Sequence, residues 1–215
     1  MARKQIADQY PTTNRIEAFS DGVFAIVITL LVLELHTPEI KNHGDWAELF
    51  FALFNLAPKF LGYVMSFFFV AVFWVAHHQF FHSLNFSRRI LLWLNNLFLF
   101  FMTFIPFPTA VLGAYYENKT SVIFFGLTFW AASITFAILR WYGWKSNETS
   151  DKFDEKSLKN AIRISFLLPT LYAIGIAAAF FSPALAIAVY FLTPILLIRG
   201  IKLKTESPHK DDLLV

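Results

Sequence analysis

The chain is 215 residues long, and 57% of its residues are hydrophobic, 19% aromatic and only 15% charged. Soluble domains carry about 25% charged residues, so this composition indicates an integral membrane protein and excludes an ordinary soluble domain. The chain has no cysteine, which excludes disulfides, thiolate metal sites and cysteine nucleophiles. The net charge of +3 is small, and because the basic residues fall in loops we assign them to membrane topology and predict no nucleic-acid partner.

The hydropathy pattern predicts six transmembrane helices, since a segment that crosses the lipid core has to satisfy its own backbone hydrogen bonds. The second segment is longer than a bilayer requires, so we expect it to tilt, to protrude, or to bend near Pro58 or Gly62. No second copy of the pattern is evident, so we predict an all-α integral membrane protein with one repeat, a transmembrane domain over residues 1–204 and a cytoplasmic tail over 205–215. In chain order the predicted spans are 14–35, 49–78, 90–112, 121–144, 161–181 and 184–200.

The loops on the two sides of the predicted membrane differ in charge. All but three of the 18 Lys and Arg residues fall on one side, the exceptions being Lys41, Lys59 and Lys119. The positive-inside rule then places both termini in the cytoplasm, which agrees with an even number of spans. The outer loop at residues 39–48 is acidic. We therefore predict a multi-pass protein of the cell membrane, embedded in the lipid bilayer.

The first span carries the most informative pattern in the chain, between Arg15 and Leu35. Its apolar run from Gly22 to Leu33 is too short to cross a bilayer, which takes roughly 20 helical residues. The helix therefore extends back through Asp21, and this places an ionisable group inside the membrane or at its edge. Such groups are costly there and mark functional sites by default.

This first helix has two distinct faces, because helical residues advance about 100° each. The residues that share one apolar stripe with a single hydroxyl are Ile26, Thr29 or Leu30, and Leu33. Asp21 lies roughly 140° away from Ile26 around the helix axis. Packing of both faces against neighbouring helices is the simpler interpretation, but the carboxylate of Asp21 requires a polar partner.

The second span ends in side chains that can donate to such a carboxylate through an indole or imidazole N–H. They are Trp74, His77, His78 and His82, and the third span adds Asn95 and Asn96 at a comparable depth. His78 and His82 also have the i, i+4 spacing of metal ligands, but no His-Glu-x-x-His pattern, cysteine or cluster of carboxylates accompanies them. We therefore predict a polar network here and no metal site.

Two motifs resemble those of the transmembrane protein 175 family of potassium channels. Residues 15–21 read Arg-x-x-x-Phe-Ser-Asp and are followed by the apolar run, and residues 74–78 read Trp-x-x-His-His. The resemblance covers the six-span layout of the whole chain, and it implies a cation channel that favours potassium. Single-repeat members of the family form tetramers in which the first helix of each subunit lines the central pore. The resemblance therefore implies a homotetramer, with K⁺ as the permeant ion and no cofactor.

In this family, bulky apolar side chains on the first helix form the narrow part of the pore, and the Phe-Ser-Asp motif faces away from it. Carried onto this sequence, the resemblance implies stacked constricting rings of Ile26 and Leu33. Thr29 contributes a ring of hydroxyls between them, and Leu30 lies at or beside the lumen. The residues expected in the supporting polar network are Arg15, Phe19, Ser20, Asp21, Trp74 and His77.

Selection is expected to work by dehydration, because no Thr-Val-Gly-Tyr-Gly loop occurs in the chain to supply a ring of backbone carbonyls. Glu34 ends the first helix on the outer side. It is either an ordinary solvated helix end or part of an acidic outer vestibule that concentrates cations.

The main alternative function is a proton-coupled secondary transporter that uses Asp21 and His77 as a proton relay. Carriers usually contain internal repeats and helices interrupted at mid-membrane, and neither is evident in the sequence. A membrane enzyme is a weaker alternative, because the sequence holds no nucleophile motif, metal cluster or cofactor loop, and we predict no catalytic residue. A membrane scaffold would leave the Arg-x-x-x-Phe-Ser-Asp motif unexplained.

Overall fold

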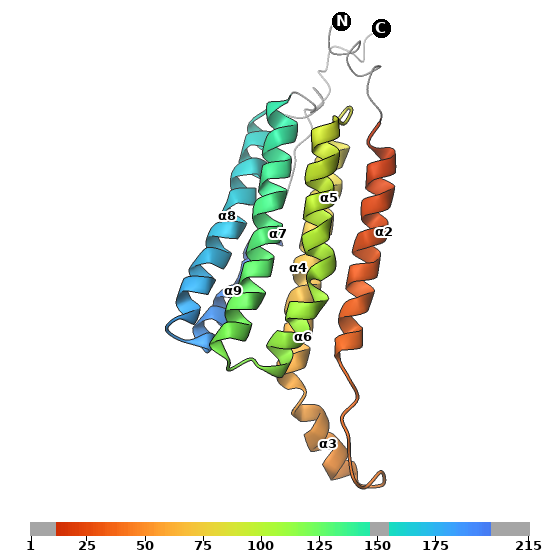
Figure 1. Ribbon diagram of the computed structural model, residues 1–215, viewed down its shortest axis with the longest axis vertical. Coiled ribbons are helices and arrows are strands. Elements are labelled where there is room, and N and C mark those ends of the chain that lie inside the picture. Colours follow the sequence, from red (N-terminus) through yellow and green to blue (C-terminus); the bar gives the residue numbers. More distant parts are fainter. Residues whose placement is uncertain (1–11, 147–154, 199–215) are drawn as a thin grey trace, which may run out of the picture.

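The computed structural model describes residues 12–146 and 155–198, and over these residues it is a bundle of helices without a β-strand. The long helices run side by side, with α2 at one edge of the bundle and α8 at the other (Figure 1). The short helix α3 projects beyond the bundle at the end where α2 finishes (Figure 1). In chain order the elements are α2 (Asn14–Leu31), η1 (Val32–Glu34), α3 (Trp46–Phe54), α4 (Ala57–His82), α5 (Arg89–Phe104), α6 (Pro106–Ala114), α7 (Lys119–Lys145), α8 (Glu155–Ala179) and α9 (Pro183–Ile198).

Five segments of the described chain are long and apolar enough to cross a membrane. They are Asn14–Glu34, Ala57–His82, Arg89–Ala114, Lys119–Lys145 and Lys156–Ala179. The prediction of an all-α, multi-pass membrane protein is therefore confirmed for the described residues. The helix α9 is apolar but shorter, so the sixth span stays a prediction. The predicted tail at 205–215 lies outside the described residues.

Two of the predicted spans are interrupted near a proline. The expected second span, 49–78, is divided into α3 and α4, with the break just before Pro58. The third consists of α5 and α6, which meet at Ile105, before Pro106. Proline has no N–H to donate and fits best in the first turn of a helix, so each proline stands at the start of a new helix. The second membrane-crossing helix consequently begins at Ala57, later in the chain than the hydropathy pattern indicated.

Aromatic side chains from three helices form the centre of the bundle. Phe69 of α4 lies 4.2 Å from Phe129 of α7, measured between ring centroids. Phe73 and Phe98 lie 5.2 and 5.0 Å from the ring of Phe136. Lipid removes most of the hydrophobic drive for helices to associate, so close packing of this kind has to hold them together through dispersion. It joins α4, α5 and α7 into one unit, and α2 rests on the first two of these helices.

Two glycines allow α9 to approach α7 and α8. The ring of Tyr190 on α9 lies against Gly126 of α7 and Gly175 of α8, and a Cβ atom at either glycine would collide with it. Tyr190 also stacks on Tyr172 of α8, with ring centroids 5.4 Å apart. Small residues at helix contacts in membranes permit this close approach. The helix α9 is therefore docked into the bundle.

Candidate functional site

One face of α2 packs against α4 and α5 at the edge of the bundle (Figure 1). Its buried residues recur at every third or fourth position, which is the spacing of a single helix face. They are Ile16, Ser20, Phe24, Val27 and Leu31. The ring of Phe24 meets the ring of His77 edge-on at 5.5 Å and lies 6.0 Å from Phe98. This face supplies the contacts that attach α2 to the rest of the chain.

The opposite face of α2 and η1 is apolar and exposed. Ile26, Leu30 and Leu33 are 59%, 41% and 65% exposed. Thr29 is also exposed, and its hydroxyl donates back to the carbonyl oxygens of Ala25 and Ile26, at 3.1 and 2.9 Å. Because the hydrogen of Thr29 is used within the helix, its oxygen remains available as an acceptor. The four residues expected to line a pore thus share one side of the helix.

A chain of hydrogen bonds crosses three helices behind this exposed face. The amide Nδ2 of Asn95 on α5 donates to Ser20 Oγ on α2 at 3.1 Å. The oxygen Oδ1 of Asn95 lies 2.8 Å from His77 Nε2 on α4. An amide oxygen only accepts, so the ring nitrogen of His77 carries the proton and donates. All three side chains are at most 1% exposed, so these bonds form where lipid and water do not compete.

A second contact joins α2 to α4 on the surface of the chain. The indole Nε1 of Trp74 donates to Asp21 Oδ1 at 2.9 Å. The ring of His78 stacks on Trp74, and His82 stacks on His78, with ring centroids 6.2 and 6.3 Å apart. The carboxylate of Asp21 therefore meets an N–H from another span, while the nearby imidazoles form a column along α4.

The remaining two residues of the expected network lie elsewhere. Phe19 is 60% exposed, and Arg15 is exposed as well. Within the described part of the chain, the side chain of Arg15 makes no hydrogen bond or ion pair. Asn95, by contrast, connects Ser20 to His77 although the sequence indicated it only as a possible member. One signal for Asn95 was available in the spacing. Asn95 lies three residues before the core residue Phe98, and the two therefore share one face of α5.

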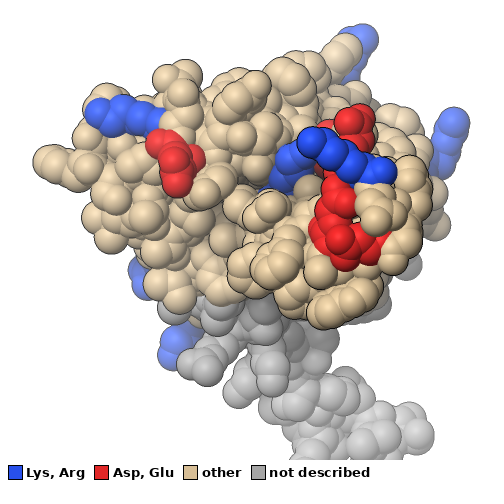
Figure 2. Space-filling model, turned by 90° about the horizontal axis from the view of Figure 1, so that it is seen from below, with Lys and Arg blue, Asp and Glu red and all other residues tan. Residues whose placement is uncertain are grey.

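The loop between η1 and α3 uses its carboxylates to order the chain before α3. Asp45 caps that helix by accepting from the backbone N–H groups of Ala47 and Glu48, at 2.9 and 3.3 Å. Glu48 accepts from the N–H groups of Lys41 and Asn42, at 2.7 and 2.9 Å. Viewed from this end, acidic and basic side chains lie close to one another (Figure 2). Glu34 ends η1 and is partly buried.

Metal-binding side chains do not gather anywhere in the two described ranges. No group of three or more His, Asp or Glu residues is placed there to hold an ion. His78 and His82 therefore belong to no such group among the described residues. The features that the structure shows at this site are its hydrogen bonds and its exposed apolar surface.

These observations define a class of protein: a multi-pass helical membrane protein whose first helix is anchored by polar contacts on one side and exposes an apolar face on another. The family described as the endosomal/lysosomal potassium channel TMEM175 matches residues 15–106, a range that includes every site residue named above. A potassium channel from Chryseobacterium sp. (strain P1-3) is 34% identical over 86% of this chain and 92% of its own length. The chain belongs to the TMEM175 family, as its motifs indicated.

Two further proteins show how far this similarity extends. The crystal structure of a lysosomal potassium-selective channel TMEM175 homolog from Chamaesiphon minutus superposes with a TM-score of 0.78 at 32% identity, covering 88% of this chain and 98% of that one. The human endosomal/lysosomal proton channel TMEM175 is 40% identical over 98 residues, which are 43% of this chain and 19% of the human protein. This chain therefore matches the two bacterial proteins over most of their length and the human protein over a short part.

Proposed function

We propose that this chain forms a potassium-selective channel, a homotetramer in the cell membrane in which four copies of α2 surround a central pore. The observation that carries the proposal is the exposed apolar face of Ile26, Leu30 and Leu33 on a helix that is anchored by its other side. The similarity to proteins named potassium channels over most of the chain supports the same conclusion.

The proposed constriction selects ions by making them shed water. Rings of Ile26 and Leu33 offer no ligand for an ion, so an ion passing them loses part of its hydration shell. Potassium holds its water less tightly than sodium, and the penalty is therefore smaller for potassium. The acceptor oxygen of Thr29 replaces some of the lost hydration between the rings. A narrow apolar passage of this kind also closes by dewetting.

The polar contacts behind α2 are proposed to set the width of the constriction. The bond between Ser20 and Asn95 holds the buried face, and the bond between Asp21 and Trp74 holds the neighbouring surface. Two restraints at different angles around one helix axis oppose its rotation. The pore-facing side chains turn with the helix, so a restraint on its rotation also fixes their positions. A site on a fixed element keeps its geometry better than one on a loop.

The proposed topology has six spans and both termini in the cytoplasm, with α9 as the sixth. This helix has 16 residues, which at 1.5 Å each span about 24 Å. The hydrocarbon core is about 30 Å thick, and a bilayer thins locally around a shorter helix at modest cost. In this arrangement Glu34 lies at the outer mouth, where four copies would attract cations.

A bi-ionic reversal potential tests the proposal, with purified protein in a planar bilayer between potassium and sodium solutions. We expect the potential to move toward the potassium equilibrium potential. Leu33→Asn should lower the potassium-to-sodium permeability ratio severalfold, since it places a polar ligand in the proposed constriction. The matched control Leu97→Asn, at a residue of α5 that is 47% exposed, should leave the ratio unchanged. Equal effects of the two substitutions would refute the assignment of the pore face.

The proton-coupled transporter makes a different prediction. It needs a proton path between Asp21 and His77, whereas each of these residues is hydrogen-bonded to a separate partner, Trp74 and Asn95. This separation supports the channel. In liposomes, a channel takes up potassium down its gradient without a proton gradient. Uptake that occurs only when a proton gradient is imposed would replace the channel by the transporter.

A further inference from the structure

An apolar groove lies between α4, α6 and α9, at the end of the bundle where α4 begins. It holds about 270 Å³ of free volume and is lined almost wholly by apolar atoms. Met65 and Leu112 are buried and form its floor, whereas Leu61 and Tyr116, each 42% exposed, form its rim. The groove therefore reaches into the bundle and opens on its surface.

The lining of this groove suits an apolar occupant. Tyr116 is the single polar side chain among the lining residues, and its hydroxyl interacts with the neighbouring carboxylate of Glu117. An ordered water needs two to four polar partners, and apolar cavities of about 150 Å³ stay dry and bind apolar molecules. The groove is larger than such cavities, so we expect a hydrocarbon in it.

The depth of the groove matches the thickness of a single leaflet. Its lining begins at Ala57, the first residue of α4, and reaches Met65. This interval is eight helical steps, which at 1.5 Å each amount to about 12 Å. Half of the hydrocarbon core is about 15 Å thick. The groove can therefore hold most of one acyl chain from the leaflet at this end of α4, which is the outer leaflet in the proposed topology.

A lysine stands beside the mouth of the groove. Lys59 of α4 is partly exposed, and its stem packs against Gly113, the residue that follows Leu112 of the floor. Among the described residues, the ammonium group of Lys59 makes no hydrogen bond or ion pair. Lysines near the ends of membrane helices extend their charge to the level of the headgroups. The positive charge at the mouth complements the phosphate of a phospholipid whose chain enters the groove.

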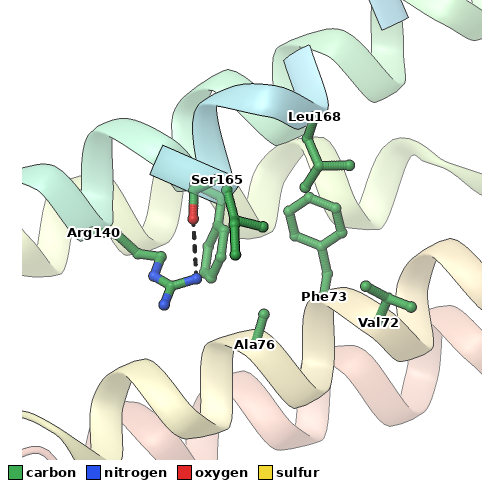
Figure 3. A pocket seen from close by; sticks show the side chains of 8 residues that line it. Val72, Phe73, Ala76, Arg140, Ser165 and Leu168 are labelled. Atoms are coloured by element: carbon green, nitrogen blue, oxygen red, sulfur yellow. Dashed lines mark hydrogen bonds between the residues drawn. The ribbon is translucent and has the colours of Figure 1, made fainter. Parts of the chain in front are cut away.

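A smaller cavity, between α4, α7 and α8, cannot take such a chain. Figure 3 shows it beside Arg140, whose Nη1 donates to Ser165 Oγ at 3.0 Å. Its free volume is about 10 Å³, which is room for about one water molecule. Only the groove on the α9 side of α4 is large enough for a hydrocarbon chain.

We propose that this groove binds one acyl chain of a membrane phospholipid, with the headgroup phosphate at Lys59. The wall formed by α9 lies toward the α8 edge of the bundle, away from α2 (Figure 1). In the proposed tetramer α2 faces the central axis, so this wall faces lipid; that part of the argument rests on the proposed function. The bound chain packs between α9 and the helices α4 and α6, and so strengthens their contact.

Native mass spectrometry tests this site on the full-length protein, purified in mild detergent and incubated with phosphatidylglycerol. We expect the wild type to retain one phospholipid per subunit. Ile187→Trp places a bulky ring in the groove and should lower the bound fraction severalfold. The matched control Leu185→Trp should keep it, because this 53% exposed residue lies about 200° away around α9.

A second pair of variants tests the position of the headgroup. Lys59→Gln should also lower the bound fraction severalfold, since it removes the charge that meets the phosphate. Lys119→Gln removes the same charge from an exposed position at the same end of the bundle and should have no effect. Equal retention by these two variants would overturn the assignment of the headgroup to Lys59.

A crystal of the wild-type protein grown with a phospholipid brominated on its acyl chains gives a second readout, which a poorly folding Ile187→Trp protein cannot affect. An anomalous peak between α4, α6 and α9 is expected. An empty groove, or a side chain of a second copy in it, would overturn the proposal, as would equal retention by Ile187→Trp and the wild type. None of these readouts involves ion current, so failure of the lipid site and failure of the proposed channel are distinguishable.

Discussion

Asn95 is the residue whose replacement tests the anchoring of α2 most directly. Its amide donates to Ser20 and accepts from His77, so one side chain ties α2 to α4 through α5. Asn95→Leu removes both bonds and keeps a similar side-chain volume, so little of its effect should come from a cavity. The adjacent residue Asn96 is exposed and offers a matched control on the same helix.

The expected loss of stability depends on the environment in which the unfolded chain is compared with the folded one, water or membrane. In water, a buried polar group left without a partner costs about 1–3 kcal/mol, and Asn95→Leu would strand two such groups, on Ser20 and His77. Within a membrane, measured hydrogen bonds between helices average about 0.6 kcal/mol and reach about 1.7, because the unfolded chain finds partners too. The membrane values apply here, so the two bonds of Asn95 together contribute about 1–3 kcal/mol.

Unfolding by SDS titration in mixed micelles measures this loss as a change in the free energy of unfolding. Asn95→Leu should be less stable by the stated amount, and Asn96→Leu should lie within about 0.5 kcal/mol of the wild type. A double-mutant cycle of Asn95→Leu with Ser20→Ala should give a coupling energy of about 0.5 kcal/mol or more. Additive effects in that cycle, or equal losses from the two asparagine variants, would refute the proposed anchor.

Three further outcomes are expected from the contacts described. Gly126→Ala should cost about 1–3 kcal/mol of unfolding free energy because its Cβ meets the Tyr190 hydroxyl. Tyr190→Phe should recover part of that loss, since it removes a hydroxyl that has no hydrogen-bond partner in the described structure but leaves the ring carbon Cζ and Ile176 beside the new Cβ; no recovery would place the collision elsewhere. Trp74→Phe removes the N–H that holds the α2 carboxylate and should speed hydrogen exchange of the α2 amides, whereas Trp93→Phe, at a residue 67% exposed, should not. Asp45→Ala removes the cap of α3 and should weaken its first turn by about 1 kcal/mol, measured by hydrogen exchange, and unchanged exchange would count against the cap.

Composition and local pattern were sufficient to predict the helical membrane class, because lipid imposes length and polarity rules on each segment separately. The motif at residues 15–21 was sufficient to indicate the family, which the comparisons confirm over most of the chain. The division of the second predicted span was harder to predict, because hydropathy continues across the break before Pro58. Because α3 is itself apolar, the hydropathy pattern does not mark where α3 ends and α4 begins.

The sequence by itself determined which residues of α2 share a face, since helical geometry depends only on spacing. Only the tertiary structure decided which polar side chains meet. Asn95 and Asn96 are identical neighbours in sequence, yet the first is buried between Ser20 and His77 and the second is exposed. Partners distant in sequence are chosen by the packing of whole helices, which no local pattern encodes.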